Sequence, residues 1–374
     1  MAVQGQAPAG DLSSSPRARV LNAVLRNQFT STNQVFLNSF ILEHWGYHVC
    51  AERMYVESVR ETGRSMRTLR HITLLGMAPD LMGTPGLYSA ALPVVGSNLS
   101  EVFRIEKTHA QQSLVVVQEA ITTYEATDEP AILESFRQAA EGQAEYVAWL
   151  ADEDDALREM GDVRYLERQG ATLQDGDLKA FILGVKEKSA RDPEFSEVPE
   201  SVKPADKSFD GRVLGWLNGL LAIEIMSIER DFVDAFIFDC HGNGALTERI
   251  TMDALGAMRR AQRITEHILA LGETPAPDTL LSASPLPPAG PKIQDYLESE
   301  RYLEEWKSSV AREALASPDL PPGPTRALVG ALLRQSEMRA AWLATAIRGG
   351  LDEGTQSAAP SVRFQAILQR WIPA

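Results

Sequence analysis

The sequence has few cysteines, few aromatic residues and no long apolar run. It contains two cysteines, Cys50 and Cys240, which excludes a disulfide scaffold and a cysteine-rich zinc or iron–sulfur site. No run of 18 apolar residues occurs, so we expect no membrane insertion. The N-terminal stretch has no apolar centre of the kind that a secretory signal needs. These absences predict a cytoplasmic protein by default, without a positive signal for that location.

Positive charge is also scarce. The chain has 36 Lys and Arg residues against 51 Asp and Glu residues, a net charge of −15. An acidic protein repels phosphate groups, so we expect it to bind neither nucleic acids nor anionic membrane surfaces. The 374 residues are 44% hydrophobic and 23% charged, which is typical of a folded globular protein. This length favours two compact domains.

Apolar residues recur at steps of three and four, which is the period of a helix with one buried face. The predicted helical segments are 17–50, 51–77, 102–126 and 130–160 in the first half, and 211–239, 246–271, 292–316 and 324–347 in the second. In both halves a long connection separates the second segment from the third. Such a connection lets these two helices lie parallel in a four-helix bundle.

The two halves also repeat in register. Seven residues of the second segment recur 196 positions later: Arg64, Arg67, His71, Ile72, Leu75, Gly76 and Pro79 match Arg260, Arg263, His267, Ile268, Leu271, Gly272 and Pro275. In the third segment Glu119-Ala120 matches Glu313-Ala314, and in the fourth Ala148-Trp149-Leu150 matches Ala341-Trp342-Leu343. We therefore predict an all-α fold of two tandem four-helix bundles. The expected divisions are a flexible N-terminus (1–17), a first bundle (18–190), a linker (191–210), a second bundle (211–350) and a C-terminal extension (351–374).

Short motifs in the first half are similar to those of a known family. They are Asn33-Gln34-Val35-Phe36-Leu37, Trp45-Gly46, Glu57-Ser58, Pro79-Asp80-Leu81, Glu119-Ala120-Ile121, Trp149-Leu150, Met160-Gly161 and Tyr165-Leu166. On these motifs, residues 18–170 resemble bacterioferritin, and the second half resembles it through the first. The resemblance implies two tandem ferritin-like bundles with long crossovers between helices two and three, packed as a pseudo-dimer.

The resemblance also implies a set of iron ligands. Bacterioferritins oxidise Fe(II) at a di-iron site, with one Glu each from helices one and three and a Glu-x-x-His pair each from helices two and four. In the first half, these positions hold Gln28, Glu61, Arg64, Ala110, Gln143 and Tyr146, with His109 beside Ala110. One carboxylate remains, and a guanidinium cannot bind a metal. The resemblance thus predicts degenerate ligand positions and no working di-iron centre in the first bundle.

The matching positions of the second half retain two carboxylates. They are Glu224, Ala257, Arg260, Glu304, Ser336 and Arg339, and Glu337 lies one step from Ser336. A single iron or other divalent ion could bind Glu224, Glu304 and Glu337, although no histidine completes the set. The alternative is that Arg64 and Arg260 replace the metals as partners in buried ion pairs, which would leave both bundles metal-free.

A further implied site concerns haem, which bacterioferritins bind between two subunits through one Met from each. That position is Thr62 in the first half and Met258 in the second. Axial ligation by the Met258 thioether is chemically sound, but a Met at helical spacing also serves as core filler. Met258 is therefore the candidate cofactor-binding residue.

Three hypotheses for function follow. The first is a bacterioferritin-like pseudo-dimer that has lost ferroxidase activity in its first bundle. It would bind no cofactor and act as a binding, accessory or assembly subunit for an iron or redox system, through a protein partner or self-association. The second is a non-haem iron oxidase or ferroxidase that uses the carboxylates of the second bundle. The third is an electron-transfer protein with haem on Met258.

Overall fold

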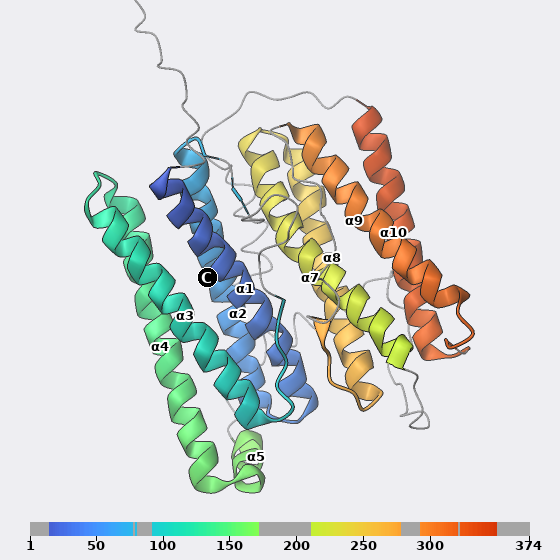
Figure 1. Ribbon diagram of the computed structural model, residues 1–374, viewed down its shortest axis with the longest axis horizontal. Helices are drawn as coiled ribbons and strands as arrows, with labels where there is room; N and C mark the ends of the chain where they lie inside the picture. Colours follow the sequence, from blue (N-terminus) through green and yellow to red (C-terminus); the bar gives the residue numbers. More distant parts are fainter. Residues whose placement is uncertain are drawn as a thin grey trace, which may run out of the picture.

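A computed structural model describes residues 15–77, 79–80, 92–171, 211–277, 292–320 and 322–349. Within these ranges every regular element is an α-helix, and the helices form two bundles that lie side by side (Figure 1). The first bundle consists of α1 (Pro16–His44), α2 (His48–Leu74), α3 (Leu99–Glu125) and α4 (Pro130–Met160), followed by the short α5 (Asp162–Ala171). The second consists of α7 (Gly211–Cys240), α8 (Gly244–Ala270), α9 (Ile293–Ala316) and α10 (Pro324–Arg348). The predicted all-α fold class is confirmed.

The main differences from the predicted helix limits lie at the two ends of the first helix and after α4. The segment predicted as 17–50 is interrupted at Gly46, whose φ of +88° ends the first helix; Gly242, at the matching place in the second half, has a φ of +72°. Helix α1 begins at Pro16, one residue before the predicted helical segment, and Ser15 caps it by accepting a hydrogen bond from the Ala18 N–H at 3.1 Å. Residues 16 and 17, which the domain division assigned to the flexible N-terminus, thus belong to this helix. Helix α5 was not predicted. The linker 191–210 and the C-terminal extension 351–374 lie outside the described residues.

The internal repeat is visible in individual hydrogen bonds. Asn22 Oδ1 of α1 accepts from the Asp80 N–H at 2.7 Å, and Asn218 Oδ1 of α7 accepts from the Ala276 N–H at 2.8 Å. Both donors lie 58 residues after their acceptors. Each bond ties the chain that follows the second helix of a bundle back to the first helix. The two halves therefore share local construction as well as helix order.

The connections between helices two and three are long in both halves. In the first bundle α2 and α3 run in the same direction (Figure 1), so the chain must return along the bundle before α3 begins. The described part of this crossover is fastened to α1: the Gln34 amide donates to the Val94 C=O and accepts from the Val94 N–H, both at 2.8 Å. The crossover between α8 and α9 is described only up to residue 277.

The two bundles pack directly against each other. Helix α1 contacts α8, and one apolar core cluster contains residues of both bundles. At the interface the Asn33 side-chain amide donates a hydrogen bond to the buried Glu229 carboxyl. Residues 33 and 229 occupy equivalent positions of the two repeats. Contact between equivalent positions is expected of a local two-fold axis, as in a homodimer, and this contact is the kind that the predicted pseudo-dimer would make.

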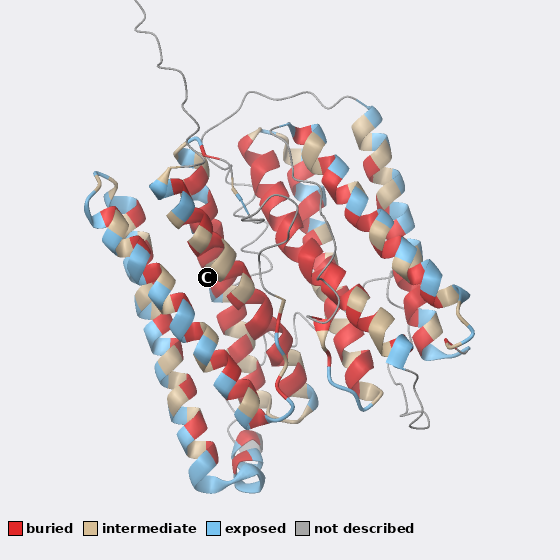
Figure 2. Cartoon of the chain, viewed as in Figure 1, coloured by how far each residue is buried: buried red, intermediate tan, exposed pale blue. Residues whose placement is uncertain are grey.

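Burial follows this arrangement, with α1 and α7 almost entirely covered and α3, α4 and α10 half-exposed (Figure 2). Among the described helices, α7 is the one that is long and apolar enough to cross a membrane. However, 72% of its most apolar 18-residue window is buried inside the protein. A core helix of a soluble protein passes the same test, so α7 is weak support for a membrane span.

Candidate functional site

The positions at which the sequence predicts degenerate ligands all lie inside the first bundle. They are Gln28, Glu61, Arg64, Ala110, Gln143 and Tyr146, and each is buried. Two further carboxyl groups, those of Glu57 and Glu106, lie among them and are 1% exposed. We call the group formed by Glu57, Glu61, Arg64, Glu106, Gln143 and Tyr146 the first polar centre.

A guanidinium group occupies part of the first polar centre. Arg64 Nη1 lies 2.9 Å from Glu57 Oε1 and 2.5 Å from Glu61 Oε1, and the Gln143 amide donates to the same Glu61 oxygen. Gly142 of α4 makes room for this side chain, because a Cβ atom at position 142 would lie 2.5 Å from Arg64 Nη2. Arg64 thus joins two carboxylates of α2 next to the backbone of α4.

Burial shifts the protonation of the remaining carboxyl groups. Burial raises the pKa of Glu61 to about 7, although the nearby Arg64 opposes the shift. Burial likewise raises the pKa of Glu106 to about 8. Glu106 accepts hydrogen bonds from the Asn38 amide at 2.6 Å and from the Tyr146 hydroxyl at 3.4 Å, both neutral donors. The first polar centre therefore limits its buried negative charge through protonation and neutral partners.

This donor set does not fit two iron ions. The ferritin-like di-iron site takes four carboxylates and two imidazoles, whereas the first polar centre offers three carboxyl groups, two of them held by a guanidinium that stays protonated. His109 is half-buried and lines a cavity of about 10 Å³ next to Glu61 and Glu106, which has room for about one water molecule. The geometry thus favours an ion pair rather than a metal pair here.

The second bundle holds a larger and more charged cluster. We call it the second polar centre; its members are Glu224, Asp231, Asp253, Arg260, Glu300, Glu304, Lys307 and Arg339. Lys307 Nζ lies 3.1 Å from carboxylate oxygens of both Glu224 and Glu304. Arg260 Nε lies 2.9 Å from the other oxygen of Glu224. An ammonium group and a guanidinium group therefore tie together α7, α8 and α9.

Arg339 is the most connected member of the second polar centre. Its Nη2 atom lies 2.5 Å from Asp231 and 2.7 Å from Glu300, its Nη1 atom 2.8 Å from Glu304, and its Nε atom 3.2 Å from Asp253. One side chain of α10 thus contacts α7, α8 and α9. The Tyr146 hydroxyl occupies the matching position of the first bundle.

The carboxyl groups of the second polar centre shift in opposite directions. Burial alone would raise the pKa of Glu304, but Lys307, Arg339 and Arg260 together hold it below its usual value. For Asp231 burial dominates and raises the pKa well above its usual value, and for Glu300 burial raises the pKa to about 7. Neighbouring cations therefore neutralise the negative charge of Glu304, whereas the raised pKa values of Asp231 and Glu300 favour their protonated, neutral forms.

The three carboxylates that were predicted to hold a metal do not converge. Glu224 and Glu304 meet around Lys307, but the Glu337 side chain is 45% exposed and binds Arg312 Nη2 at 2.7 Å. Neighbouring helix residues do not share a face, and Ser336 is the buried one of this pair. The described ranges contain no group of three or more His, Cys, Asp or Glu side chains placed to hold a metal ion. With ammonium and guanidinium groups between the carboxylates, the second polar centre does not fit a di-iron site.

The candidate haem ligand lies near the boundary between the bundles. Met258 is half-buried and packs against the apolar cluster that both bundles share. At the matching position Thr62 is buried, and its hydroxyl donates to the Ser58 carbonyl at 2.9 Å. These two matching positions thus offer one thioether instead of two.

Some members of the centres were missed by sequence reasoning, although the repeat contained a signal for them. Glu106 matches Glu300 at the same spacing that pairs Glu119-Ala120 with Glu313-Ala314, and Glu57 matches Asp253 at the spacing of helix two. An acidic residue at an inward position of both halves would have pointed to the polar centres. Lys307 had no such signal, since its counterpart is Ser113.

Comparison with known proteins agrees with this geometry. Residues 18–160 match the family model of the ferritin-like domain. The chain is also 34% identical, over 88 residues, to a bacterioferritin of Mycobacterium leprae (strain TN). That match covers 24% of this chain and 52% of the relative, so the chain spans about half the length of the curated relative that it matches. The predicted resemblance to the ferritin-like superfamily is confirmed for residues 18–160; for the second bundle it stays a prediction based on the repeat.

Proposed function

We propose that the protein is a cytoplasmic bacterioferritin-like pseudo-dimer that has lost ferroxidase activity in its first bundle. In this proposal it acts as a binding or accessory subunit of an iron or redox system, through a protein partner or self-association. The ferritin-like domain supports the link to iron. The observation that carries the proposal is the contact of Arg64 with both Glu57 and Glu61 inside the first bundle.

The loss of ferroxidase activity follows from electrostatics. Two Fe(II) ions would place four positive charges next to the Arg64 guanidinium, whose carboxylate partners among the described residues are Glu57 and Glu61. Removal of Arg64 from Glu57 and Glu61 would leave a buried cation unpaired, which costs several kcal/mol. In the second bundle, three cations stand between the carboxylates, and the same argument applies there with more force.

The accessory role is supported by the fusion of two different bundles. A symmetric assembly of identical subunits requires identical surfaces, whereas two fused bundles can diverge. The interface position that holds Asn33 in one repeat holds Glu229 in the other. A chain with two unlike halves is suited to present different faces to different partners.

Iron loading tests the proposal. The purified chain is incubated anaerobically with Fe(II), exposed to oxygen, desalted and analysed for iron, with a bacterioferritin treated in parallel as the positive control. We expect less than one iron per chain after desalting and Fe(II) oxidation no faster than in buffer. Stoichiometric iron with rapid oxidation would contradict the proposal.

The same experiment separates the two other hypotheses. Iron that is retained by the native chain but lost in the double variant Glu224→Ala, Glu304→Ala would support an iron oxidase of the second bundle. A haem Soret band that is lost in Met258→Leu would support haem-mediated electron transfer. We expect neither signal, because cations occupy the carboxylate site and the second thioether is replaced by Thr62.

A further inference from the structure

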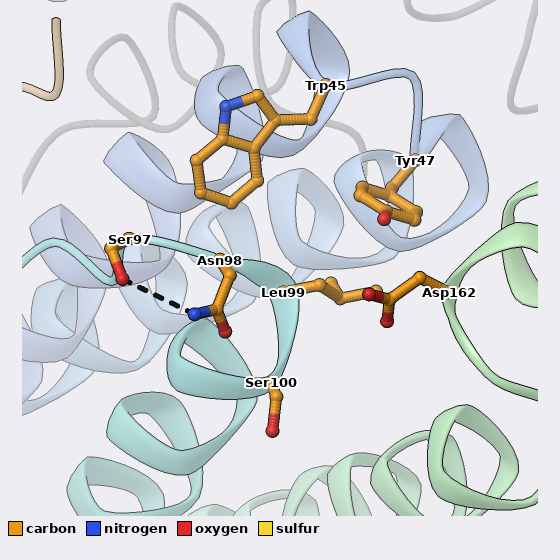
Figure 3. Close-up of a pocket in the computed structure, with 7 residues that line it drawn as sticks. All are labelled: Trp45, Tyr47, Ser97, Asn98, Leu99, Ser100 and Asp162. Atoms are coloured by element: carbon orange, nitrogen blue, oxygen red, sulfur yellow. Dashed lines mark hydrogen bonds between the residues drawn. The ribbon is translucent and has the colours of Figure 1, made fainter.

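An open pocket lies at one end of the first bundle, away from both polar centres. The turn between α1 and α2, the start of α3 and the junction of α4 with α5 meet there (Figure 3). The pocket has a volume of about 530 Å³ and is lined by Trp45, Tyr47, Ser97, Asn98, Leu99, Ser100 and Asp162. This volume falls in the range of small-molecule sites. Of these seven residues none is positively charged and one, Asp162, is negatively charged.

The aromatic wall of the pocket is held in place by the core. Trp45 is half-buried and packs against the apolar core clusters, and the Tyr47 ring lies 6.2 Å from the ring of Tyr165. Tyr165 is itself fully buried, and its hydroxyl lies 3.1 Å from Cys50 Sγ. Both aromatic faces are therefore positioned without a ligand, which lowers the entropy that binding would cost.

A carboxylate completes the aromatic wall. Asp162 is the first residue of α5, and it is exposed at the mouth of the pocket next to Leu99 (Figure 3). Its charge acts on the aromatic wall: burial and the Asp162 carboxylate both raise the pKa of Tyr47. The negative charge of Asp162 that acts on Tyr47 would also attract a cation in the pocket.

The start of α3, which also borders the pocket, is capped by its own side chains. Backbone N–H groups at a helix start commonly bind anions, but here the N–H groups of Glu101 and Ser97 are already satisfied. Asn98 Oδ1 accepts from the Glu101 N–H at 3.0 Å, and the Glu101 carboxylate accepts from the Ser97 N–H at 2.8 Å and from its hydroxyl at 2.7 Å. Glu101 also adds a second negative charge beside the pocket.

We propose that this pocket binds an alkylammonium or guanidinium group, whose charge faces Asp162 and whose carbon chain lies on Trp45 and Tyr47. A cation is attracted to aromatic faces and to a carboxylate at the same time. The matching end of the second bundle has His241 and Asn243 in place of the two aromatic residues, so the site belongs to the first bundle. It goes beyond the proposed function, because it involves neither polar centre and does not depend on metal content.

Titration calorimetry on the full chain tests this site with four probes. They are n-butylammonium chloride, n-butylguanidinium chloride, the neutral 1-butanol and sodium sulfate. We expect saturable binding of the two cations in the millimolar range and none of 1-butanol or sulfate. Asp162→Asn should weaken cation binding about five- to tenfold, whereas the matched control Glu145→Gln, which removes one exposed charge from α4, should leave it unchanged. Trp45→Phe, which keeps an aromatic ring, should weaken it about two- to threefold.

The outcomes separate support from refutation. A fifth probe, a short peptide with a central Lys, shows where the cation comes from: if it binds as well as n-butylammonium, a protein side chain is the source. Binding of n-butylammonium without binding of the peptide would identify a free amine; both results support the site. Equal binding of 1-butanol, binding of sulfate, or cation binding that survives Asp162→Asn in a normally folded variant would overturn it. None of these results bears on iron loading, so the two proposals fail independently.

Discussion

The two bundles bury carboxylates at matching positions but neutralise them in different ways. In the first, Glu106 meets the neutral Tyr146 and Asn38. In the second, its counterpart Glu300 meets the guanidinium of Arg339. The two halves thus share the inward positions of their carboxyl groups. The first bundle neutralises these groups with protons and one guanidinium, and the second uses several cations.

This difference separates what the fold determines from what the side chains determine. Four helices in this arrangement direct the same inward positions toward the bundle axis in both halves, whatever residues occupy them. Whether the axis then holds metals, protons or ammonium and guanidinium groups depends on the charges placed there. A ferritin-like fold alone is therefore no argument for an iron centre.

The largest difference is expected from the matched substitutions Arg339→Met and Tyr146→Phe. Arg339→Met removes a cation from Asp231, Glu300 and Glu304 and leaves buried carboxylates uncompensated, so it should lower the free energy of unfolding by about 3–5 kcal/mol. Tyr146→Phe removes a single long hydrogen bond and should cost about 1 kcal/mol. Urea-induced unfolding monitored by circular dichroism measures both values.

Peptide-resolved hydrogen exchange then shows where the destabilisation falls. Arg339→Met should increase exchange first in α7–α10, and Tyr146→Phe in α1–α4. If the two substitutions cost the same, the contrast between the cation-bound Glu300 and the neutral surroundings of Glu106 would be wrong.

Glu106 and Glu304 should contribute to the pH dependence of the protein's stability with opposite signs. The pKa of Glu106 is raised in the folded state to about 8, so below the unfolded pKa the residue is protonated in both states. As the pH rises from about 4.5 to about 8, the unfolded state releases this proton while the folded state keeps it. Stability then falls by up to about 1.4 kcal/mol per pH unit. Glu106→Gln keeps an acceptor for Asn38 and should remove this loss, so the variant gains on the native chain as the pH rises.

For Glu304 the sign is reversed. Its pKa is lowered in the folded state by Lys307, Arg339 and Arg260, against the effect of burial. Its stabilisation is therefore present above the unfolded pKa and is lost as the pH falls through the folded value. Glu304→Gln should be less stable than the native chain at neutral pH and approach it in acid. Urea unfolding of both variants from about pH 3 to about pH 8 checks this, and parallel curves for the two would contradict the opposite shifts.

A smaller difference is expected from placing Ala at two helical glycines, Gly142 and Gly256. Gly→Ala inside a helix normally stabilises by about 1 kcal/mol. At position 142 the new Cβ would lie 2.5 Å from Arg64 Nη2 and 3.2 Å from Arg64 Cζ. The whole guanidinium group must therefore shift relative to Glu57 and Glu61, and we expect a net loss of about 1 kcal/mol. At position 256 the new Cβ would lie 3.0 Å from Arg260 Nη1 and 3.9 Å from Arg260 Cζ, so only the tip of the side chain must give and most of the gain should remain. Melting temperatures that rise equally in both variants would show that Arg64 is free to move.

Much of the fold was predictable because helical periodicity and the repeat are local properties of the sequence. Most helix limits follow from the spacing of apolar residues, although the break at Gly46 does not, and the inward positions of Gln28, Glu61 and Arg64 follow from the resemblance to bacterioferritin. The contents of the centres were harder to predict, since a residue such as Lys307 or Asp231 reads as exposed from its type alone. Its burial depends on partners from other helices, and sequence spacing within one helix does not reveal them. Glu337 shows the converse, because a carboxylate one step from an inward position lies on the surface.

The smallest difference concerns the hydrogen bond that the two halves share. Asn22→Ala and Asn218→Ala each remove one acceptor for a backbone N–H, at Asp80 and Ala276, and each should cost about 1 kcal/mol. The first bundle has a second fastening at this point, because Arg26 Nη1 donates to the Asp80 carbonyl at 2.9 Å, whereas the matching residue of α7 is Ala222. Hydrogen exchange of the Ala276 amide should therefore accelerate in the variant Asn218→Ala. Hydrogen exchange of the Asp80 amide should accelerate less in the variant Asn22→Ala. In the double variant Asn22→Ala, Arg26→Ala, hydrogen exchange of the Asp80 amide should accelerate as much as that of Ala276 does in Asn218→Ala. If it does not, contacts other than those of Asn22 and Arg26 hold the crossover of the first bundle.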